Sequence, residues 1–213
     1  MDRTFKATTY ILALPLLLTG GPALADWSAN VGWASDYYFR GILQKSSSAS
    51  GGVDFGQGGF YAGVWAADVG EGADSGLEVD GYFGYGGTIA EDFSYGVGFT
   101  GYYYTGDFDD TYQEINLSAG YGIVTFDVAL GEYDNAGGPT QDYAFYSFTA
   151  EYNGFFGTYG VFDEDFDGSY IQAGYGTTIA EIDISFSALY SDDDLIGEAD
   201  EALIFTIGKT FDF

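Results

Sequence analysis

"EINLSAGYGIVTFDVAL" (residues 114–130) alternates apolar and polar side chains on both sides of a central glycine. The apolar positions are Ile115, Leu117, Ala119 and Tyr121 before Gly122, and Val124, Phe126, Val128 and Leu130 after it. A period of two is that of a β-strand with one apolar and one polar face. The stretch therefore predicts two antiparallel strands joined by a tight turn near Gly122.

The same alternation recurs along the chain, in roughly twelve runs, and no stretch shows the helical period of 3.6 residues. The expected strands lie near 27–40, 49–55, 59–67, 77–85, 93–104, 114–121, 124–130, 143–152, 155–162, 169–175, 182–188 and 203–213. In the first run, Trp27, Val31, Trp33, Tyr37 and Phe39 are expected on the apolar face. The 34 glycines and the aromatic share of 20 % also suit strands better than helices.

Alternation alone fits both a soluble β-sandwich and a membrane barrel, and the connections distinguish the two. Every second connection is short: 56–59, 87–92, near 122, 153–154 and 177–181. The intervening connections are longer or more acidic: 41–48, 68–76, 106–110, 132–141, 163–168 and 191–201. The sequence therefore predicts an antiparallel transmembrane β-barrel with short periplasmic turns and longer acidic outer loops.

Residues 1–25 have the pattern of a secretory signal peptide. Arg3 and Lys6 precede an apolar run, and "ALA" (23–25) fits a cleavage site. We expect residues 26–213 to form a single barrel domain in the outer membrane of a Gram-negative bacterium.

Composition excludes several function classes. The chain carries 33 acids against 5 bases, a net charge of −28, which would repel nucleic acid. It contains no histidine and no cysteine, so Ser–His and Cys–His nucleophilic sites cannot form. We therefore expect no enzyme.

The predicted strands place several charged side chains on the inward face. The pore-lining candidates are Asp36, Arg40, Glu78, Asp80, Glu114, Asp127, Glu151 and Asp183. Acidic rings concentrate cations and repel anions. Twelve tilted strands give a backbone diameter of about 24 Å, with at most about 10–12 Å clear inside, which large tyrosines could close, and no room for a plug domain. A lumen filled by polar neighbours or water remains the alternative.

The loop "DEDFDG" (163–168) is the sharpest metal candidate. Asp163, Asp165 and Asp167, with Gly168, match the first half of a calcium loop, but Gly174 stands where an EF-hand needs glutamate. A different Ca²⁺ or Mg²⁺ site at this tip and a merely solvated acidic loop both remain open. Acids of the outer loops are also candidates to share divalent ions with lipopolysaccharide.

The last eight residues, "TIGKTFDF" (206–213), alternate toward a terminal phenylalanine. Thr206, Gly208, Phe211 and Phe213 resemble the C-terminal signal by which bacterial outer-membrane barrels are recognised for insertion. The resemblance implies contact with the barrel-assembly machinery, and Phe211 and Phe213 are expected in the inner aromatic girdle beside membrane lipid.

Three blocks, "SDYYFRGILQ" (35–44), "GFYAGVWAADV" (59–69) and "LEVDGYFGY" (77–85), resemble those of the TorF-type porins, a proteobacterial family of small outer-membrane barrels. The resemblance implies the fold and the location. The leading hypothesis is a channel for passive diffusion of small solutes, cation-preferring through its acidic lumen. One alternative is a non-conducting structural or surface barrel whose loops bind divalent cations. The other is a soluble secreted β-protein.

Overall fold

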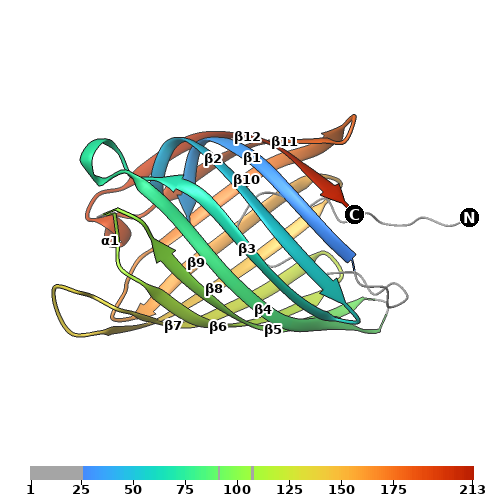
Figure 1. Cartoon of the computed structure of the whole chain (residues 1–213), viewed down its shortest axis with the longest axis horizontal. Coiled ribbons are helices and arrows are strands. Elements are labelled where there is room, and N and C mark those ends of the chain that lie inside the picture. Colours follow the sequence, from blue (N-terminus) through green and yellow to red (C-terminus); the bar gives the residue numbers. More distant parts are fainter. Residues whose placement is uncertain (1–25, 91, 107) are drawn as a thin grey trace, which may run out of the picture.

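The computed structural model describes residues 26–213 except Glu91 and Asp107, so the predicted signal peptide (1–25) lies outside the described residues. The described chain forms one closed antiparallel barrel (Figure 1). Its strands are β1 (Asp26–Phe39), β2 (Ile42–Gln57), β3 (Phe60–Val69), β4 (Gly76–Ala90), β5 (Phe93–Tyr104), β6 (Tyr112–Tyr121), β7 (Val124–Tyr133), β8 (Gln141–Tyr152), β9 (Phe155–Glu164), β10 (Ser169–Ile179), β11 (Ile182–Ser191) and β12 (Asp200–Asp212).

Each strand pairs with its sequence neighbours, and β12 returns to β1 to close the ring. In that last pairing Gly32 lies opposite Gly208 and Ala29 opposite Phe211. Beyond the ladder, the Phe213 N–H donates to the Trp27 carbonyl at 2.9 Å. Closure by consecutive hairpins leaves no strand edge unpaired, which is the arrangement a chain needs to cross lipid.

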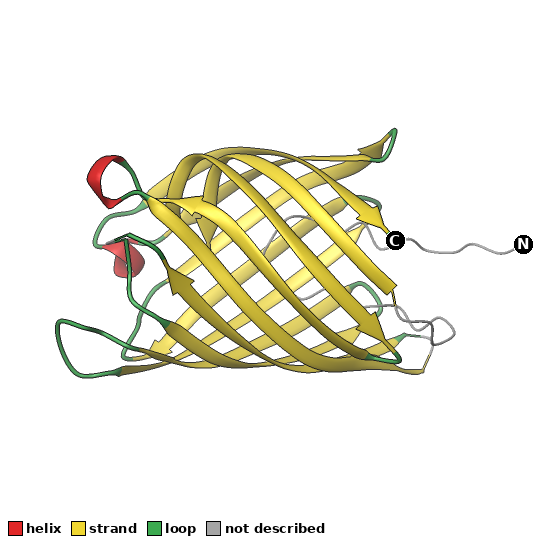
Figure 2. Cartoon of the chain, in the orientation of Figure 1, coloured by secondary structure: helices red, strands yellow, loops and turns green. Residues whose placement is uncertain are grey.

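The two ends of the barrel differ (Figure 2). One end, here called the turn end, carries the C-terminus and tight turns such as Asn153–Gly154 and Ala180–Glu181, whose residues have positive φ. The other, the loop end, carries longer connections with the short helices η1 (Gly72–Asp74) and α1 (Asp193–Ile196). Across the described residues, no helix has the length and apolar character needed to span a membrane.

The outer surface of the barrel is apolar. The outward side chains of Val31, Phe83 and Ile115 are all more than 50 % exposed. By contrast, the inward Glu78, on the same strand as Phe83, is 0 % exposed, and the inward Glu114, on the same strand as Ile115, is 1 % exposed. Large apolar side chains exposed all around a closed barrel would be unfavourable in water and favourable in hydrocarbon. The predicted transmembrane β-barrel is confirmed, with twelve strands.

The β1–β2 connection corrects the sequence prediction. Residues 41–48 were expected to be an outer loop, yet β2 begins at Ile42 and the connection is Arg40–Gly41. Both residues have positive φ (49° and 86°), as a tight type I′ hairpin turn requires. A bulge at Tyr37/Tyr38 marks where this hairpin leaves the regular wall.

Tyr37 and Phe39 also differ from the prediction, which placed them on the outer apolar face. The Tyr37 hydroxyl donates to Glu78, and the Phe39 ring lies 5.3 Å from the inward Tyr102 ring. Both contacts lie inside the barrel. The end of the hairpin bends over the interior, so Tyr37 and Phe39 lie inside the barrel while Leu43 beyond the turn is exposed.

Candidate functional site

The end of the β1–β2 hairpin, residues 37–45, is here called the β1–β2 tip. It touches the wall on both sides. Ser191, the last residue of β11, donates its hydroxyl to the Gly41 carbonyl at 2.5 Å. On the other side, the Gly70 N–H donates to the Gln44 carbonyl, and Lys45 Nζ donates to the Gly70 carbonyl, both at 2.9 Å. The β1–β2 tip therefore extends across the loop end of the lumen.

Arg40 lies at the turn of the β1–β2 tip and pairs with Glu114 of β6. Its Nη1 and Nη2 donate to Glu114 Oε2 and Oε1 at 2.9 and 2.8 Å. The guanidinium also lies over the Phe39 and Phe145 rings, 4.8 and 4.4 Å from their centroids. A bidentate, ring-stacked contact is specific to arginine, because the planar fork matches the carboxylate. This ion pair fastens the tip to the wall of β6.

The Glu114 carboxylate is saturated with donors. Besides Arg40, it accepts from the hydroxyls of Tyr102 and Tyr143 at 2.5 and 2.9 Å and from Asn116 Nδ2 at 3.0 Å. The Glu114 side chain is 0 % exposed and that of Arg40 13 % exposed. A buried ion pair is stable only when its remaining hydrogen-bonding groups are satisfied, and here they are.

Glu78 and Asp80 form a second acidic group on the inward face of β4. The Tyr37 hydroxyl of the tip donates to Glu78 Oε1 at 2.9 Å. Among the described residues, Glu78 Oε2 and Asp80 Oδ1 are buried without a hydrogen-bond partner. This second contact between the tip and the wall is thus less well satisfied than the first.

Apolar and aromatic side chains fill the remaining space at the loop end. The buried cluster comprises Tyr38, Ala129, Tyr143, Phe145, Phe162, Tyr170, Leu189 and Ile204. A Cβ on Gly41 would come within 2.7 Å of Tyr170 Cβ, so the tip sits directly on this packing. The upper limit of about 10–12 Å for the clear width is therefore not reached at this level, because the β1–β2 tip, here called the plug, and these side chains occupy the lumen.

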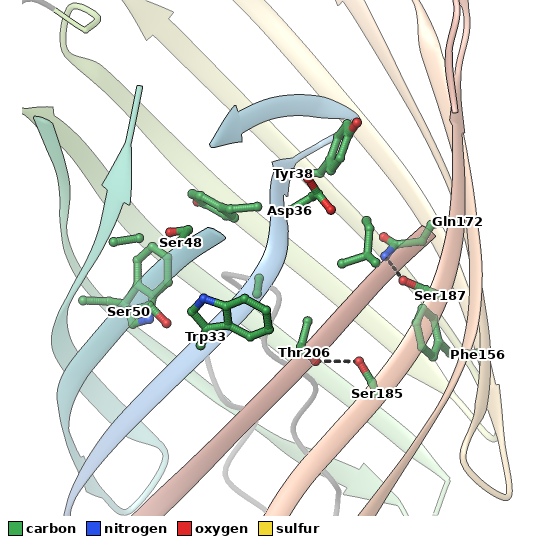
Figure 3. Close-up of a pocket in the computed structure, with 15 residues that line it drawn as sticks. Trp33, Asp36, Tyr38, Ser48, Ser50, Phe156, Gln172, Ser185, Ser187 and Thr206 are labelled. Carbon is green, nitrogen blue, oxygen red and sulfur yellow. Dashed lines mark hydrogen bonds between the residues drawn. The ribbon is translucent and has the colours of Figure 1, made fainter. Parts of the chain in front are cut away.

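Beneath the β1–β2 tip lies a cavity (Figure 3). It is lined by Trp33, Ala34, Asp36, Tyr37, Tyr38, Ser48, Ser50, Trp65, Ala67, Phe156, Gln172, Ser185, Ser187, Ile204 and Thr206. Several of its polar groups pair with one another or with the backbone: Gln172 with Ser187 at 2.9 Å and Ser185 with Thr206 at 2.6 Å. The cavity combines hydroxyls, aromatic rings and one carboxylate.

The eight pore-lining candidates divide into groups. Arg40 and Glu114 are in contact, Glu78 and Asp80 lie together on β4, and Asp36 lines the cavity. Asp127, Glu151 and Asp183 stand on β7, β8 and β11. Glu151 and Asp183 lie near the turn end, where Asp183 accepts from the Thr178 hydroxyl at 2.5 Å.

The three candidate metal ligands of loop 163–168 accept hydrogen bonds from three different backbone groups. Asp163, Asp165 and Asp167 each accept a backbone N–H, from Glu164, Asp142 and Gly168 respectively. Within the described ranges, no group of three or more acidic side chains is arranged to hold a metal ion. The structure thus does not bring the predicted ligands together.

Asp192 anchors the loop that carries α1. It accepts from the Ser169 backbone N–H at 3.0 and 2.9 Å and from the Ser169 hydroxyl at 2.6 Å. Slight burial acts to raise the pKa of Asp192, but these hydrogen bonds outweigh it and lower the pKa below its usual value. In the same loop, Leu195 packs against the buried cluster and lies close to Gly41 of the β1–β2 tip.

The C-terminal residues occupy the closing strand. The inward Thr206 bonds to Ser185, and Phe211 and Phe213 are 43 and 81 % exposed near the turn end. Lys209 of the same strand pairs with Glu181 at 3.0 Å. These positions suit the predicted girdle.

The sequence profile of Gcw_chp, described as a bacterial protein of unknown function, matches residues 20–210. No curated protein matches the chain. Acinetobacter baumannii OccAB3 is similar at 14 % identity and a TM-score of 0.42, over 86 % of this chain and 60 % of that one. Pseudomonas aeruginosa OprD is similar at 13 % identity and a TM-score of 0.42, over 89 % of this chain and 67 % of that one. This chain thus spans about three fifths of OccAB3 and two thirds of OprD.

A structure from work on the in-meso crystallization of membrane proteins matches at 11 % identity and a TM-score of 0.52, over 88 % of this chain and 84 % of that one. At this identity the likeness concerns the fold alone.

Proposed function

The chain belongs to Gcw_chp, a bacterial family of unknown function, and we propose that it is an outer-membrane, porin-like channel for passive diffusion of small solutes. The observation that carries the proposal is a polar, acidic interior enclosed by an apolar wall. Such a wall fits lipid, and such an interior fits water and ions. The transport proposal does not depend on similarity to any porin.

We propose that the channel prefers cations. Seven of the eight inward candidates are acids, and the one inward base, Arg40, is neutralised by Glu114. Asp127, Glu151 and Asp183 therefore give the part of the lumen beyond the plug a net negative charge. A narrow interior with that charge concentrates cations and excludes anions.

The β1–β2 tip closes this channel in the conformation described, so conduction requires the tip to move. Besides its hydrogen bonds to Ser191 and Gly70, the tip is held by three side-chain contacts inside the barrel: the Arg40–Glu114 pair, the Tyr37–Glu78 hydrogen bond and the contact of Gly41 with Tyr170. A hairpin held in this way can exchange between a seated and a released position as a unit. The proposal is therefore a channel with a low open probability.

A planar-bilayer recording under a potassium chloride gradient tests the cation preference. We expect rare openings whose reversal potential lies toward that of potassium. The combined variant Asp127→Asn, Glu151→Gln, Asp183→Asn should move it toward zero. A matched variant of three loop acids outside the lumen, Asp163→Asn, Asp165→Asn, Asp167→Asn, should leave it unchanged. A reversal potential on the chloride side would contradict the proposal.

The filled loop end favours one second candidate, a non-conducting structural or surface barrel. The acidic loops would then carry its function, by binding divalent cations together with lipopolysaccharide. This candidate predicts silence in the bilayer together with calcium-dependent retention on lipopolysaccharide-coated beads. The channel proposal predicts openings whether or not calcium is present.

Location and assembly complete the proposal. We propose that residues 1–25 are cleaved on export, that the loop end faces outward, and that the TorF-type resemblance reflects a shared porin role. The final strand, with Phe211 and Phe213, would meet the barrel-assembly machinery. Fractionation with heat-modifiable gel mobility tests this against a soluble secreted protein, which would stay in the periplasmic fraction.

A further inference from the structure

Of the described residues that line the cavity beneath the β1–β2 tip, Asp36 is the one with a charged side chain. Figure 3 shows it between two groups of wall residues, with Ser48 and Ser50 on one side and Gln172, Ser187 and Phe156 on the other. Among the described residues, Asp36 accepts one hydrogen bond, from Ser46 at 2.8 Å. A carboxylate with two oxygens has acceptor capacity beyond one hydroxyl. Asp36 is therefore able to bind a further donor in the cavity.

No base within the described part of the chain neutralises Asp36. Arg40 is engaged by Glu114, Lys45 donates to the Gly70 carbonyl, and Lys209 pairs with Glu181. These three are all the bases of residues 26–213. The negative charge of the cavity is thus left for an ion from outside the protein.

The rest of the lining is suited to an apolar body rather than to a hydrated inorganic ion. The Tyr37 and Trp65 rings pack edge to face, with centroids 5.8 Å apart, and Phe156 and Ile204 add further apolar surface. Aromatic faces attract cations, and they attract organic cations best when these are poorly hydrated. The hydroxyls offer little competition, because Ser185, Ser187 and Thr206 are already paired.

The cavity has a volume of about 50 Å³, which has room for a methylated ammonium and not for an aromatic ring. We propose that it binds a small monovalent organic cation, an ammonium group carrying one or two methyl groups. The charged head pairs with Asp36 and the methyl groups lie against Trp65, Tyr37 and Phe156. The inference rests on the proposed function in that the solute enters through the barrel interior. The inference goes further because it names a class of solute and a solute-binding site below the plug.

Calorimetric titration of the folded protein in uncharged detergent tests the proposal with three probes of similar size: methylammonium, methanol and formate. We expect saturable binding of one methylammonium per chain, with methanol about tenfold weaker or worse and formate without heat. Asp36→Asn should weaken methylammonium binding by about tenfold or more. The matched variant Asp163→Asn, a loop acid outside the lumen, should bind as wild type does.

Equal binding of methanol and methylammonium by the wild-type protein would overturn the proposal, even if Asp36→Asn failed to fold. Unchanged methylammonium binding by a folded Asp36→Asn variant would overturn it as well. Since the titration needs no conductance, selective binding by a protein that is silent in a bilayer would sustain the site and remove the channel. Conduction by a protein that shows no selective binding would sustain the channel and remove the site.

Discussion

Arg40 and Glu114 stand 74 positions apart in the chain, and their side chains meet inside the barrel as a bidentate ion pair with N–O distances of 2.8 and 2.9 Å. One partner lies at the turn of a hairpin and the other on β6. The contact converts the β1–β2 tip from an outer loop into a plug. The stability and the permeability of the barrel should both respond to it.

Breaking this ion pair should destabilise the barrel strongly. Arg40→Gln leaves Glu114 buried without its counter-charge, at a cost of about 3–5 kcal/mol in the free energy of unfolding. Glu114→Gln should cost a similar amount, and the double variant less than the sum because no charge remains unpaired. Urea unfolding in micelles, followed by heat-modifiable mobility, measures each value.

The exposed pair Lys209–Glu181 is the matched control. Its side chains are 28 and 83 % exposed, and such pairs contribute less than about 1 kcal/mol. Equal losses for Lys209→Gln and Arg40→Gln would show that the buried pair does not hold the tip.

Gly41→Ala should displace the β1–β2 tip. Gly41 has a φ of 86°, and an added Cβ would lie 2.7 Å from Tyr170 Cβ. Because the Tyr170 Cβ is bonded directly to the backbone, it cannot move far. Gly58→Ala imposes similar backbone strain at φ 59° in a turn whose Cβ direction is open. We expect faster protease cleavage within the released tip for Gly41→Ala alone. Identical cleavage of the two variants would argue against a closely seated tip.

Replacing Asp80 should stabilise the protein. Within the part of the chain that the structure describes, Asp80 Oδ1 and Glu78 Oε2 are buried without hydrogen-bond partners, and an unsatisfied buried polar group costs about 1–3 kcal/mol. Asp80→Asn supplies an amide N–H₂ that can donate to Glu78, so the urea midpoint should rise. Asp183→Asn, near the turn end, is the control and should leave the midpoint within error. A lower midpoint for Asp80→Asn would mean that the second carboxylate is needed in its charged form.

Single thiols along β6 should report the two faces of the wall. The chain has no cysteine, so a spin label at each of the positions 115–119 is unique. Labels at 115, 117 and 119 should collide mainly with oxygen dissolved in lipid, and those at 116 and 118 mainly with a water-soluble nickel chelate. Loss of the alternation, or its inversion, would contradict the assignment of the apolar face to lipid.

The barrel could be predicted from the sequence because apolar and polar side chains alternate along each strand and so distinguish its two faces. Alternation such as that of Ile115 to Tyr121 identifies the strands, and the contrast between short and long connections identifies the ends. Residues 41–48 escaped this reasoning. They lack alternating apolar side chains, since Lys45 and the following serines belong to a hairpin whose end is enclosed by the barrel rather than by lipid.

The site was predictable only in part. Strand parity places Glu78, Asp80 and Glu114 inside, but it cannot say which wall a side chain from the β1–β2 turn will reach. Sequence reasoning allowed that large tyrosines close the lumen, and Tyr102 and Tyr143, which donate to Glu114, are two of them. Bulky tyrosines on the inward face of neighbouring strands indicate a filled lumen, because a water-filled channel needs small or charged side chains there.

Single-channel recording of wild type beside the double variant Arg40→Gln, Glu114→Gln tests the central claim most directly. The double variant removes the ion pair that seats the tip without leaving either charge buried alone. The predicted result is rare opening of wild type and a several-fold higher open probability for the double variant, both reversing toward the potassium potential. Silence of both proteins, each shown to be folded by heat-modifiable mobility, would contradict a channel closed by the β1–β2 tip.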